Sequence, residues 1–158
     1  FAVDDCYLTW ETPIGSLTAI QEGEGLGALC QTHRMDLCGL EERETPLLEA
    51  VRQQMMEYFS GKRKVFDLPL SLKGTPFQKE VWNALRQIPF GETRSYKELA
   101  QMVGNPKACR AVGMANHNNP IMIVVPCHRV VGSDGKLTGY AGGLSLKAAL
   151  LELEKKYR

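Results

Sequence analysis

The sequence predicts two small domains of different classes, an α/β domain followed by a mostly α-helical domain. Residues 6–33 show the alternation of apolar and polar side chains that is typical of short strands. Residues 75–156 instead show apolar residues at helical spacing in several short segments. Lys73-Gly74 separates the two patterns as a connector. We therefore expect an N-terminal domain over residues 1–73 and a C-terminal domain over residues 74–158.

A small antiparallel sheet and one helix are expected in the N-terminal domain. Glycine-containing turn signals at residues 13–15 and 23–25 divide the alternating region into strands. Thr45 is a good N-cap, and the proline after it suits the first position of a helix over residues 46–60. Residues 65–70 are expected to add a short strand, and this domain shows no chemistry of its own.

The C-terminal domain is expected to consist of short helices joined by glycine- and proline-containing turns. Thr75-Pro76 repeats the N-cap and proline opening, and Gly142-Gly143 precedes the last helix. The expected elements are helices over residues 76–88, 96–103, 106–116 (capped by Asn105) and 144–156, with a brief apolar strand over residues 121–125 between prolines 120 and 126.

Two of these helices, joined at Gly104-Asn105-Pro106, form a helix-turn-helix pattern. The second helix projects two long cations, Lys107 and Arg110. A helix that presents little bulk and a few cations can lie along a DNA groove. Close packing between helices also uses small residues, so both interpretations stay open at this point. The small residues of the helix are Ala108, Ala111, Gly113 and Ala115.

Charge is unevenly distributed along the chain. Residues 1–74 carry 7 Lys and Arg against 12 Asp and Glu, whereas residues 75–158 carry 12 against 6. The second half therefore has a balance of +6 and is suited to a polyanionic partner, although chance segregation of surface charge gives the same pattern. No apolar run approaches the roughly 20 residues of a membrane span, and no basic-then-apolar leader opens the sequence, so we expect no membrane association.

The cysteines indicate free thiols in a reducing compartment. There are 5 of them, an odd number, and no Cys-x-x-Cys pair occurs. Cys30, His33 and Cys38 lie close together in the sequence, and Cys6 would be a fourth candidate metal ligand. Their spacing matches no recognised zinc site, so buried thiols are the favoured interpretation and no metal is expected.

Cys127 is the strongest candidate for a reactive residue. The apolar run at 121–125 leads into Pro126, and the turn presents Cys127 with His128 and Arg129 beside it. A thiolate is the nucleophilic form, and His128 can take the proton directly or through a water. The alternative is a buried structural cysteine next to a surface histidine. A glycine-rich loop at residues 139–143 contains Tyr140, which could stack on a flat ligand.

The segment Pro-Cys-His-Arg-Val at 126–130 resembles the active-site motif of the O6-alkylguanine-DNA alkyltransferases, also called methylated-DNA–protein-cysteine methyltransferases. The resemblance covers residues 74–156 strongly and residues 1–73 in general layout, through Thr12-Pro13-Ile14-Gly15. The other matching segments follow the order and spacing of that family; they are residues 74–78, 91–96, 110–113, 118–120 and 138–144.

This resemblance implies a catalytic role for five residues. Cys127 would accept the alkyl group, His128 would act as base through a bound water, and Glu154 would orient the histidine. Asn119 would hold the turn before the active-site segment. Tyr96 would push on the target phosphate, help to rotate the base out of the duplex, and protonate the departing guanine.

The resemblance also implies how DNA is bound. Arg110 would enter the base stack as a finger that fills the space of the flipped nucleotide, with Ala111 beside it on the same helix. Lys97, Asn105 and Ser133 fall where the family contacts the DNA backbone. The base pocket would be lined by Met122, Val130, Tyr140 and Gly142.

The implied activity is DNA repair by a methylated-DNA–[protein]-cysteine S-methyltransferase that acts once. It would take the alkyl group from O6-alkylguanine, and from O4-alkylthymine, in double-stranded DNA bound through the minor groove. The fold implied is a ribonuclease H-like N-terminal domain and a winged-helix-like C-terminal domain. A monomer without metal or other cofactor is expected, in the cytoplasm of a prokaryote or the nucleus of a eukaryote.

Two departures and three rival functions remain at this stage. The zinc site of eukaryotic members is not reproduced, and Ala141 stands where some members have a serine near the base. A lesion-binding relative without catalysis would lack the acceptor cysteine, whereas Cys127 is present. A Cys-His hydrolase would normally take its histidine from elsewhere in the chain, and a DNA-binding regulator is supported only by the helix-turn-helix pattern.

Overall fold

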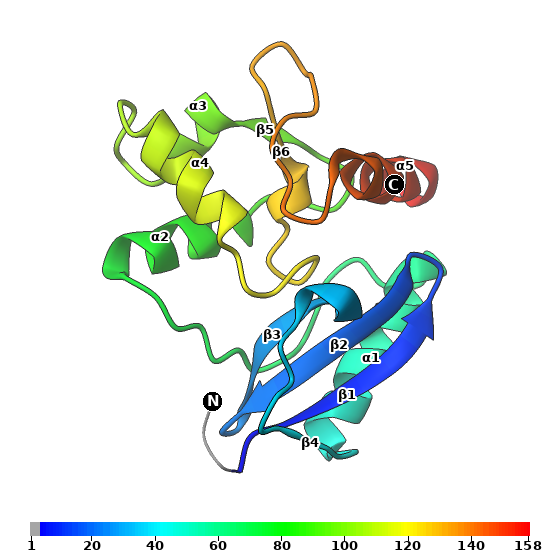
Figure 1. Ribbon diagram of the computed structural model, residues 1–158. Helices are drawn as coiled ribbons and strands as arrows, with labels where there is room; N and C mark the ends of the chain where they lie inside the picture. Colours follow the sequence, from blue (N-terminus) through cyan, green and yellow to red (C-terminus); the bar gives the residue numbers. More distant parts are fainter. Residues whose placement is uncertain (1–3) are drawn as a thin grey trace. The chain divides into compact units, whose positions relative to one another are not determined.

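The computed structural model describes residues 4–158. The chain divides into two compact units, Phe1–Lys73 and Gly74–Arg158, and each is described separately (Figure 1). The first unit contains a small mixed sheet and a helix, and the second contains four α-helices among its described elements. The fold class predicted from the sequence, an α/β domain followed by a mostly helical domain, is confirmed.

The sheet of the first unit has the strand order β3-β2-β1-β4. Strands β1 (Cys6–Thr12), β2 (Gly15–Glu22) and β3 (Gly25–Gln31) form an antiparallel meander, and the short β4 (Glu41–Glu42) pairs parallel to β1. Both hairpins have two-residue turns, which the sequence placed correctly. Gly15 and Gly23 have φ values of 98° and 60°, a region in which side chains with a Cβ are strained, so the glycines permit these turns.

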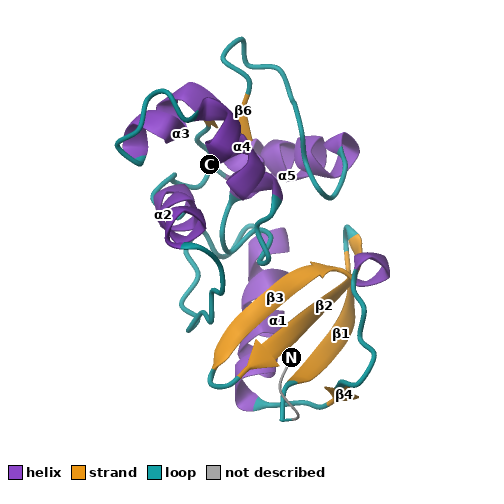
Figure 2. Ribbon diagram, turned by 60° about the vertical axis from the view of Figure 1, so that its left-hand side comes forward, coloured by secondary structure: helices purple, strands orange, loops and turns teal. Residues whose placement is uncertain are grey.

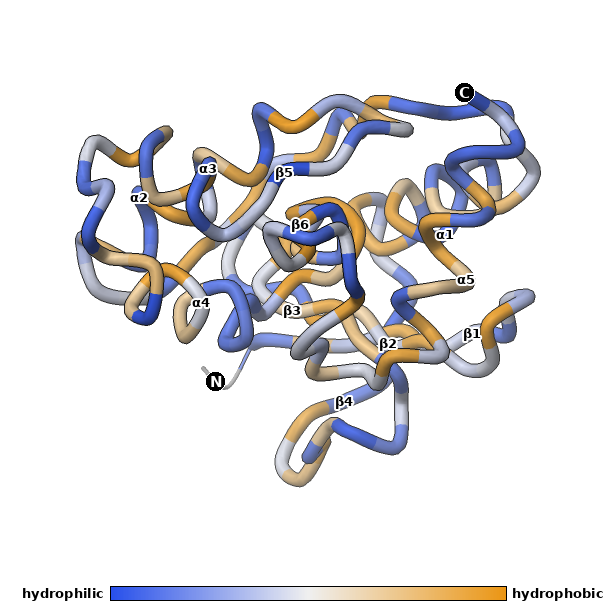
Figure 3. Tube along the Cα trace, turned by 90° about the horizontal axis from the view of Figure 1, so that it is seen from above, coloured by the Kyte–Doolittle hydropathy of each residue, from blue (hydrophilic) through white to orange (hydrophobic). Residues whose placement is uncertain are grey.

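Helix α1 (Pro46–Phe59) packs against one face of this sheet (Figure 2). It begins as predicted, because the Thr45 hydroxyl accepts a hydrogen bond of 3.0 Å from the backbone N–H of Leu48. Hydrophobic and hydrophilic residues alternate along its trace (Figure 3). Its buried residues are Leu48, Val51, Met55, Tyr58 and Phe59. A single 3-10 turn, η1 (Thr32–Arg34), follows β3.

The strand expected at residues 65–70 is not formed. Leu70 makes only an isolated parallel bridge to Leu26, supported by hydrogen bonds of 2.8 Å from Leu26 N–H to the Pro69 carbonyl and from Ser71 N–H to the Leu26 carbonyl. Pro69 has no N–H to donate to a ladder, so the pairing cannot extend toward the N-terminal side of the segment.

The second unit contains α2 (Pro76–Leu85), α3 (Tyr96–Met102), α4 (Cys109–His117) and α5 (Leu144–Tyr157). A small parallel pair, β5 (Arg94–Ser95) with β6 (Val130–Val131), and the 3-10 turn η2 (Cys127–Arg129) complete it. Its core includes Trp82, whose indole N–H donates a 2.9 Å hydrogen bond to the Ala115 carbonyl and so joins α2 to α4. None of the helices within residues 4–158 is long and apolar enough to cross a bilayer.

Two helix boundaries differ from the expectation. Helix α2 ends at Leu85 rather than near residue 88, although Ile88 is buried as its apolar spacing suggested. Helix α4 begins at Cys109 rather than Pro106, and Asn105 does not cap it. Gly104 adopts a φ of 76°, and the Asn105 N–H donates to the Ala100 carbonyl at 3.0 Å. Residues 104–108 therefore form the C-terminal cap of α3 and the turn that follows it, and they are not available to begin α4.

The apolar segment at residues 121–125 is a tight turn and not the expected strand. Val124 N–H donates to the Met122 carbonyl at 2.7 Å, and Val125 N–H donates to the Ile121 carbonyl at 3.2 Å. Ile123 is held at a φ of 69°, which a β-branched residue rarely adopts. The apolar composition of residues 121–125 therefore predicted their burial correctly. Their backbone groups form hydrogen bonds within the segment and not with a neighbouring strand.

The start of α2 gives a direct test of how capping stabilises the second unit. The Thr75 hydroxyl accepts from Gln78 N–H at 3.1 Å, and the Gln78 side chain accepts from Thr75 N–H at 2.9 Å, which is a reciprocal capping box. We expect Thr75→Ala to lower the free energy of unfolding by about 1 kcal/mol, measured by urea denaturation. Thr75→Ser keeps the hydroxyl and should retain most of this energy; equal losses for both variants would contradict the capping role.

Candidate active site around Cys127

Cys127 lies at the start of η2 and is almost completely buried, with 7% of its surface exposed. Its backbone N–H donates to the Val125 carbonyl at 2.8 Å, and its own carbonyl accepts from the side-chain amide of Asn116 at 3.4 Å. Asn116 belongs to α4, so this helix and the cysteine turn are directly connected. The cysteine is thus held in a fixed position at the end of a buried turn.

The side chain of Asn119 braces the turn that leads to Cys127. Its amide nitrogen donates to the carbonyls of Ile121 at 3.1 Å and Val125 at 2.8 Å, and its oxygen accepts from Ile121 N–H at 3.0 Å. These three hydrogen bonds satisfy backbone groups on both sides of the strained Ile123. The position predicted for Asn119, before the active-site segment, is the position from which it closes this turn.

His128, Arg129 and Glu154 form a buried cluster next to the cysteine. The His128 Nε2 lies 2.5 Å from Glu154 Oε2, and Arg129 donates to both oxygens of the same carboxylate, at 2.8 Å from Nε and 3.1 Å from Nη2. A third nitrogen of Arg129 donates to the Ile88 carbonyl at 2.7 Å. The carboxylate, carried by α5, therefore holds two consecutive side chains of η2.

The protonation states of this cluster follow from burial and charge. Burial lowers the pKa of His128 and outweighs the raising effect of Glu154, while the positive charges of Arg129 and Lys147 lower it further. Burial alone would raise the pKa of Glu154, but the hydrogen bonds from His128 and Arg129 and the positive charge of Arg129 hold it far below its usual range. At neutral pH we therefore expect an ionised Glu154 and a neutral His128.

A neutral His128 has one nitrogen ready to accept a proton. Because Nε2 faces the Glu154 carboxylate, its hydrogen must be on Nε2, and Nδ1 must carry the lone pair. Nδ1 is buried and has no hydrogen-bond partner within residues 4–158. The cluster can thus supply a base whose tautomer is set by the carboxylate behind it.

The Cys127 thiol is subject to opposing influences. Burial raises its pKa, which favours the protonated thiol. Hydrogen bonding from the side chains of Asn119 and Tyr140, and the positive charge of Lys147, lower its pKa and so favour the thiolate. A buried cysteine surrounded by groups that stabilise its anion is the arrangement of a nucleophile rather than of a structural thiol.

The glycine-rich loop that carries Tyr140 is held at its start by hydrogen bonds from Tyr96 and Lys147. Tyr96 donates from its hydroxyl to the Thr138 carbonyl at 3.1 Å, and Lys147 donates from Nζ to the same oxygen at 2.9 Å. The Lys147 ammonium also lies 6.0 Å from the centre of the Tyr96 ring. Tyr96, at the start of α3, and Lys147, in α5, therefore both fix the loop that is expected to line the base pocket.

The remaining predicted residues divide into a buried and an exposed group. Of the four expected pocket residues, Met122 and Val130 are buried and Tyr140 and Gly142 are half-buried. Of the six expected DNA contacts, Tyr96 is half-buried and the other five are exposed; they are Lys97, Asn105, Arg110, Ala111 and Ser133. Helix α4 exposes Arg110, Ala111, Met114 and His117, and Lys107 is exposed in the turn before the helix.

One buried side chain was missed by reasoning from the sequence. Lys147 has no exposed surface, and it lies on the same face of α5 as the buried Leu150 and Glu154. The spacing of three and seven residues from Lys147 to these two is the available signal, because a lysine in a buried helical stripe is unusual. The full role of Arg129, expected only to add positive charge, was also not foreseen.

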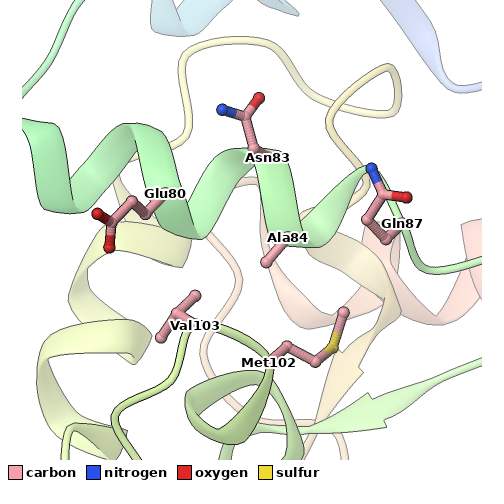
Figure 4. Close-up of a pocket in the computed structure, with 6 residues that line it drawn as sticks. All are labelled: Glu80, Asn83, Ala84, Gln87, Met102 and Val103. Atoms are coloured by element: carbon pink, nitrogen blue, oxygen red, sulfur yellow. The ribbon is translucent and has the colours of Figure 1, made fainter.

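Outside this cluster, the described residues offer no candidate metal site. Within residues 4–158, no group of three or more His, Cys, Asp and Glu side chains is arranged to hold a metal ion, and all five cysteines are free. A cavity of about 460 Å³ lies between α2 and the end of α3. None of its lining residues, which are drawn in Figure 4, belongs to the predicted site. They are Glu80, Asn83, Ala84, Gln87, Met102 and Val103.

Comparison with known proteins gives matches over both units. Residues 76–156 match the family model of the 6-O-methylguanine DNA methyltransferase DNA binding domain, and residues 6–72 match that of its ribonuclease-like domain. A constitutive methylated-DNA–protein-cysteine methyltransferase of Bacillus subtilis is 49% identical over 94% of both chains. A methylated-DNA–protein-cysteine methyltransferase of Methanosarcina acetivorans is 47% identical over 94% of this chain and 97% of its own. The crystal structure of Mycobacterium tuberculosis OGT in complex with DNA superposes with a TM-score of 0.89 at 48% identity, covering 96% of this chain and 93% of that one.

The buried His128–Glu154–Arg129 cluster predicts that acid destabilises the fold in two steps. The unfolded chain takes up a proton on His128 near pH 6.5 and on Glu154 near pH 4.3, whereas their lowered pKa values keep the folded state from doing so. The free energy of unfolding should therefore be highest above about pH 6.5, fall as the pH drops below it, and fall further below about pH 4.3.

Urea denaturation between pH 4 and 8 measures this dependence. His128→Gln should remove the step near pH 6.5, and the exposed His117→Gln serves as the matched control that keeps it. Stability that is independent of pH between 5 and 7 in the unmodified protein would contradict the neutral, buried state of His128.

Proposed function

Because the chain belongs to the 6-O-methylguanine DNA methyltransferase family, we propose that it repairs DNA by transferring the alkyl group of O6-alkylguanine to its own Cys127. We extend the proposal to O4-alkylthymine, whose alkylated oxygen has similar chemistry. The observation that carries the proposal is a buried cysteine followed by a histidine whose Nε2 is held by a carboxylate, which leaves Nδ1 as the base.

In the proposed reaction, the Cys127 proton passes to His128 Nδ1 through a water, and Glu154 stabilises the imidazolium that forms. The Cys127 sulfur attacks the alkyl carbon, so that a carbon–sulfur bond forms while the bond from carbon to the O6 of guanine breaks. The electrons of that bond stay on the base, and the Tyr96 hydroxyl supplies the proton that neutralises it. The geometry of the cluster supports the first step, because Arg129 keeps Glu154 ionised at neutral pH.

Transfer to the protein itself makes the protein a reagent that is used once. The product at Cys127 is a thioether, which has no easy route of hydrolysis. No second nucleophile is proposed to remove the group, so one alkyl group is taken up per chain.

DNA must present the modified base outside the duplex in this proposal. Only 7% of Cys127 is exposed, so a base stacked inside a helix cannot bring its alkyl group to the sulfur. We infer that the exposed face of α4 enters the minor groove, where the small side chain of Ala111 leaves room beside Arg110. Arg110 would then fill the gap in the stack, and Lys97, Asn105 and Ser133 would contact the backbone.

The two parts of the chain have different roles in this proposal. Residues 74–158 carry the transfer and the contacts with DNA, and residues 1–73 serve as a structural domain. The free state of all five thiols supports action in a reducing compartment, which is the cytoplasm in a prokaryote and the nucleus in a eukaryote. We propose that the protein acts as a monomer.

The proposed transfer is tested by intact mass. Mixing the protein with duplex DNA that contains one O6-methylguanine should add one methyl group, about 14 Da, to each chain, and peptide mapping should place it on Cys127. Cys127→Ser should gain no mass and still bind the duplex, because the DNA-contacting face is unchanged. The exposed Cys38→Ser is the matched control and should react normally. An unchanged mass, or continuing turnover of a peptide or ester, would reject the transferase.

The role proposed for Arg110 separates base extrusion from chemistry. Extruding a base costs a few kcal/mol, and this cost does not apply to a free modified base. We expect Arg110→Ala to slow transfer from duplex DNA at least about tenfold and to leave transfer from free O6-benzylguanine nearly unchanged. Lys107→Ala, which removes an exposed cation from the turn before the same helix, should mainly weaken duplex binding in a salt-dependent way. Equal losses on both substrates would contradict the finger role.

A further inference from the structure

Helix α4 carries an exposed stripe of three long side chains, and the middle one is apolar. Arg110, Met114 and His117 are spaced by four and three residues, so they fall within about 60° of one another around the helix axis. Met114 has 61% of its surface exposed. Single exposed hydrophobic residues are common on proteins, but this one lies in the middle of the face that is proposed to meet DNA.

The residues that follow Met114 anchor this part of the helix. The Ala115 carbonyl accepts the indole N–H of Trp82 at 2.9 Å, and the Asn116 side chain donates to the Cys127 carbonyl at 3.4 Å. Both Ala115 and Asn116 are buried. Met114 is therefore a flexible apolar side chain on a helical segment that is fixed to α2 and to the turn of the reactive cysteine.

We propose that Met114 is a second wedge in the minor groove, which partly unstacks the base pairs beside the space that Arg110 fills. The inference rests on the proposed function, because it requires α4 to enter the groove at the modified base. Proteins that bind the minor groove frequently insert an apolar side chain, methionine among them, between base steps. Met114 would thus help to open the duplex and take no part in the chemistry at Cys127.

The spacing along the helix fits two neighbouring insertions. Met114 follows Arg110 by about 6 Å along the helix axis, and helical side chains lean toward the N-terminal end, so Met114 extends toward Arg110. Base pairs in a duplex are about 3.4 Å apart, so the two side chains can reach steps that are close to one another. The roles are complementary, because Arg110 offsets phosphate charge whereas Met114 brings no charge between the bases.

Two other roles for Met114 give different results in an experiment. An apolar contact with the deoxyribose walls of the groove would raise affinity and leave the flanking bases stacked. A contact with a second copy of the chain would make the protein self-associate. Unstacking at one defined base step therefore distinguishes a wedge from both of them.

The test uses duplexes that contain one O6-methylguanine with 2-aminopurine, which fluoresces more strongly when unstacked, on its 5′ or its 3′ side. The protein is Cys127→Ser, so that binding is not followed by transfer. Adding Met114→Gln keeps the length of the side chain and removes its apolar end. At saturating protein we expect this change to remove about half of the fluorescence rise on one side of the lesion and none on the other. Met114→Leu should retain the rise, and Met102→Gln, at an exposed methionine of α3, should have no effect.

Transfer rates and salt dependence give a second readout. Met114→Gln in the otherwise unmodified protein should slow transfer from saturating duplex about fivefold and leave transfer from free O6-benzylguanine unchanged. Its affinity for the duplex should keep the salt dependence of the unmodified protein, because no phosphate contact is lost. Lys107→Ala should instead reduce the slope of log affinity against log salt by about one.

Three results would overturn the inference. They are flanking fluorescence that Met114→Gln leaves unchanged, an equal decrease on both sides of the lesion, and self-association in sedimentation velocity that Met114→Gln abolishes. Failure of the unmodified protein to take up a methyl group from duplex DNA would instead reject the proposed function. The fluorescence measurement in Cys127→Ser reports unstacking without transfer, so the two failures are distinguishable.

Discussion

The ion pair between Arg129 and Glu154 is the interaction on which the rest of the site depends. The carboxylate receives two hydrogen bonds from Arg129, faces His128 Nε2, and accepts a further one from Gly91 N–H at 3.1 Å. It thereby joins α5 to the 3-10 turn of the cysteine and to the loop after α2. Since the positive charge of Arg129 offsets the negative charge of the carboxylate, the histidine beside it can remain neutral in a buried environment. The base of the proposed reaction is thus prepared by a residue that does not touch the substrate.

Charge balance in this interior links structure to reactivity. Two cations, Arg129 and Lys147, and one carboxylate, Glu154, are buried around a thiol that is neutral at rest. The imbalance is one positive charge. A low-dielectric surrounding strengthens the attraction between opposite charges, although it also makes an unpaired thiolate costly. Burial therefore opposes ionisation of the Cys127 thiol, whereas the hydrogen bonds of Asn119 and Tyr140 favour it. This balance suits a nucleophile that reacts once and with only one kind of substrate.

The turn at residues 121–125 shows how a strained segment is maintained for function. Ile123 has a positive φ, and the three hydrogen bonds of Asn119 hold the backbone on either side. The same turn fixes Val125, whose carbonyl receives the backbone N–H of Cys127. The cysteine is consequently placed by local hydrogen bonds rather than by a sheet, and the link from Asn116 ties it to the helix that is proposed to meet DNA.

Local signals in the sequence determined the two-domain class, most helix starts and the reactive cysteine, because caps, periodicity and the Pro-Cys-His-Arg-Val segment act over a few residues. The same reasoning failed at residues 65–70, 106–108 and 121–125, where strand pairing or hydrogen bonds determine the backbone conformation. Only the tertiary structure decided that Arg129 shares Glu154 with His128 and that Lys147 is buried without a carboxylate. These facts depend on segments up to 26 residues apart meeting in a water-poor interior, where the partner of a charge is set by packing and not by its neighbours in the chain.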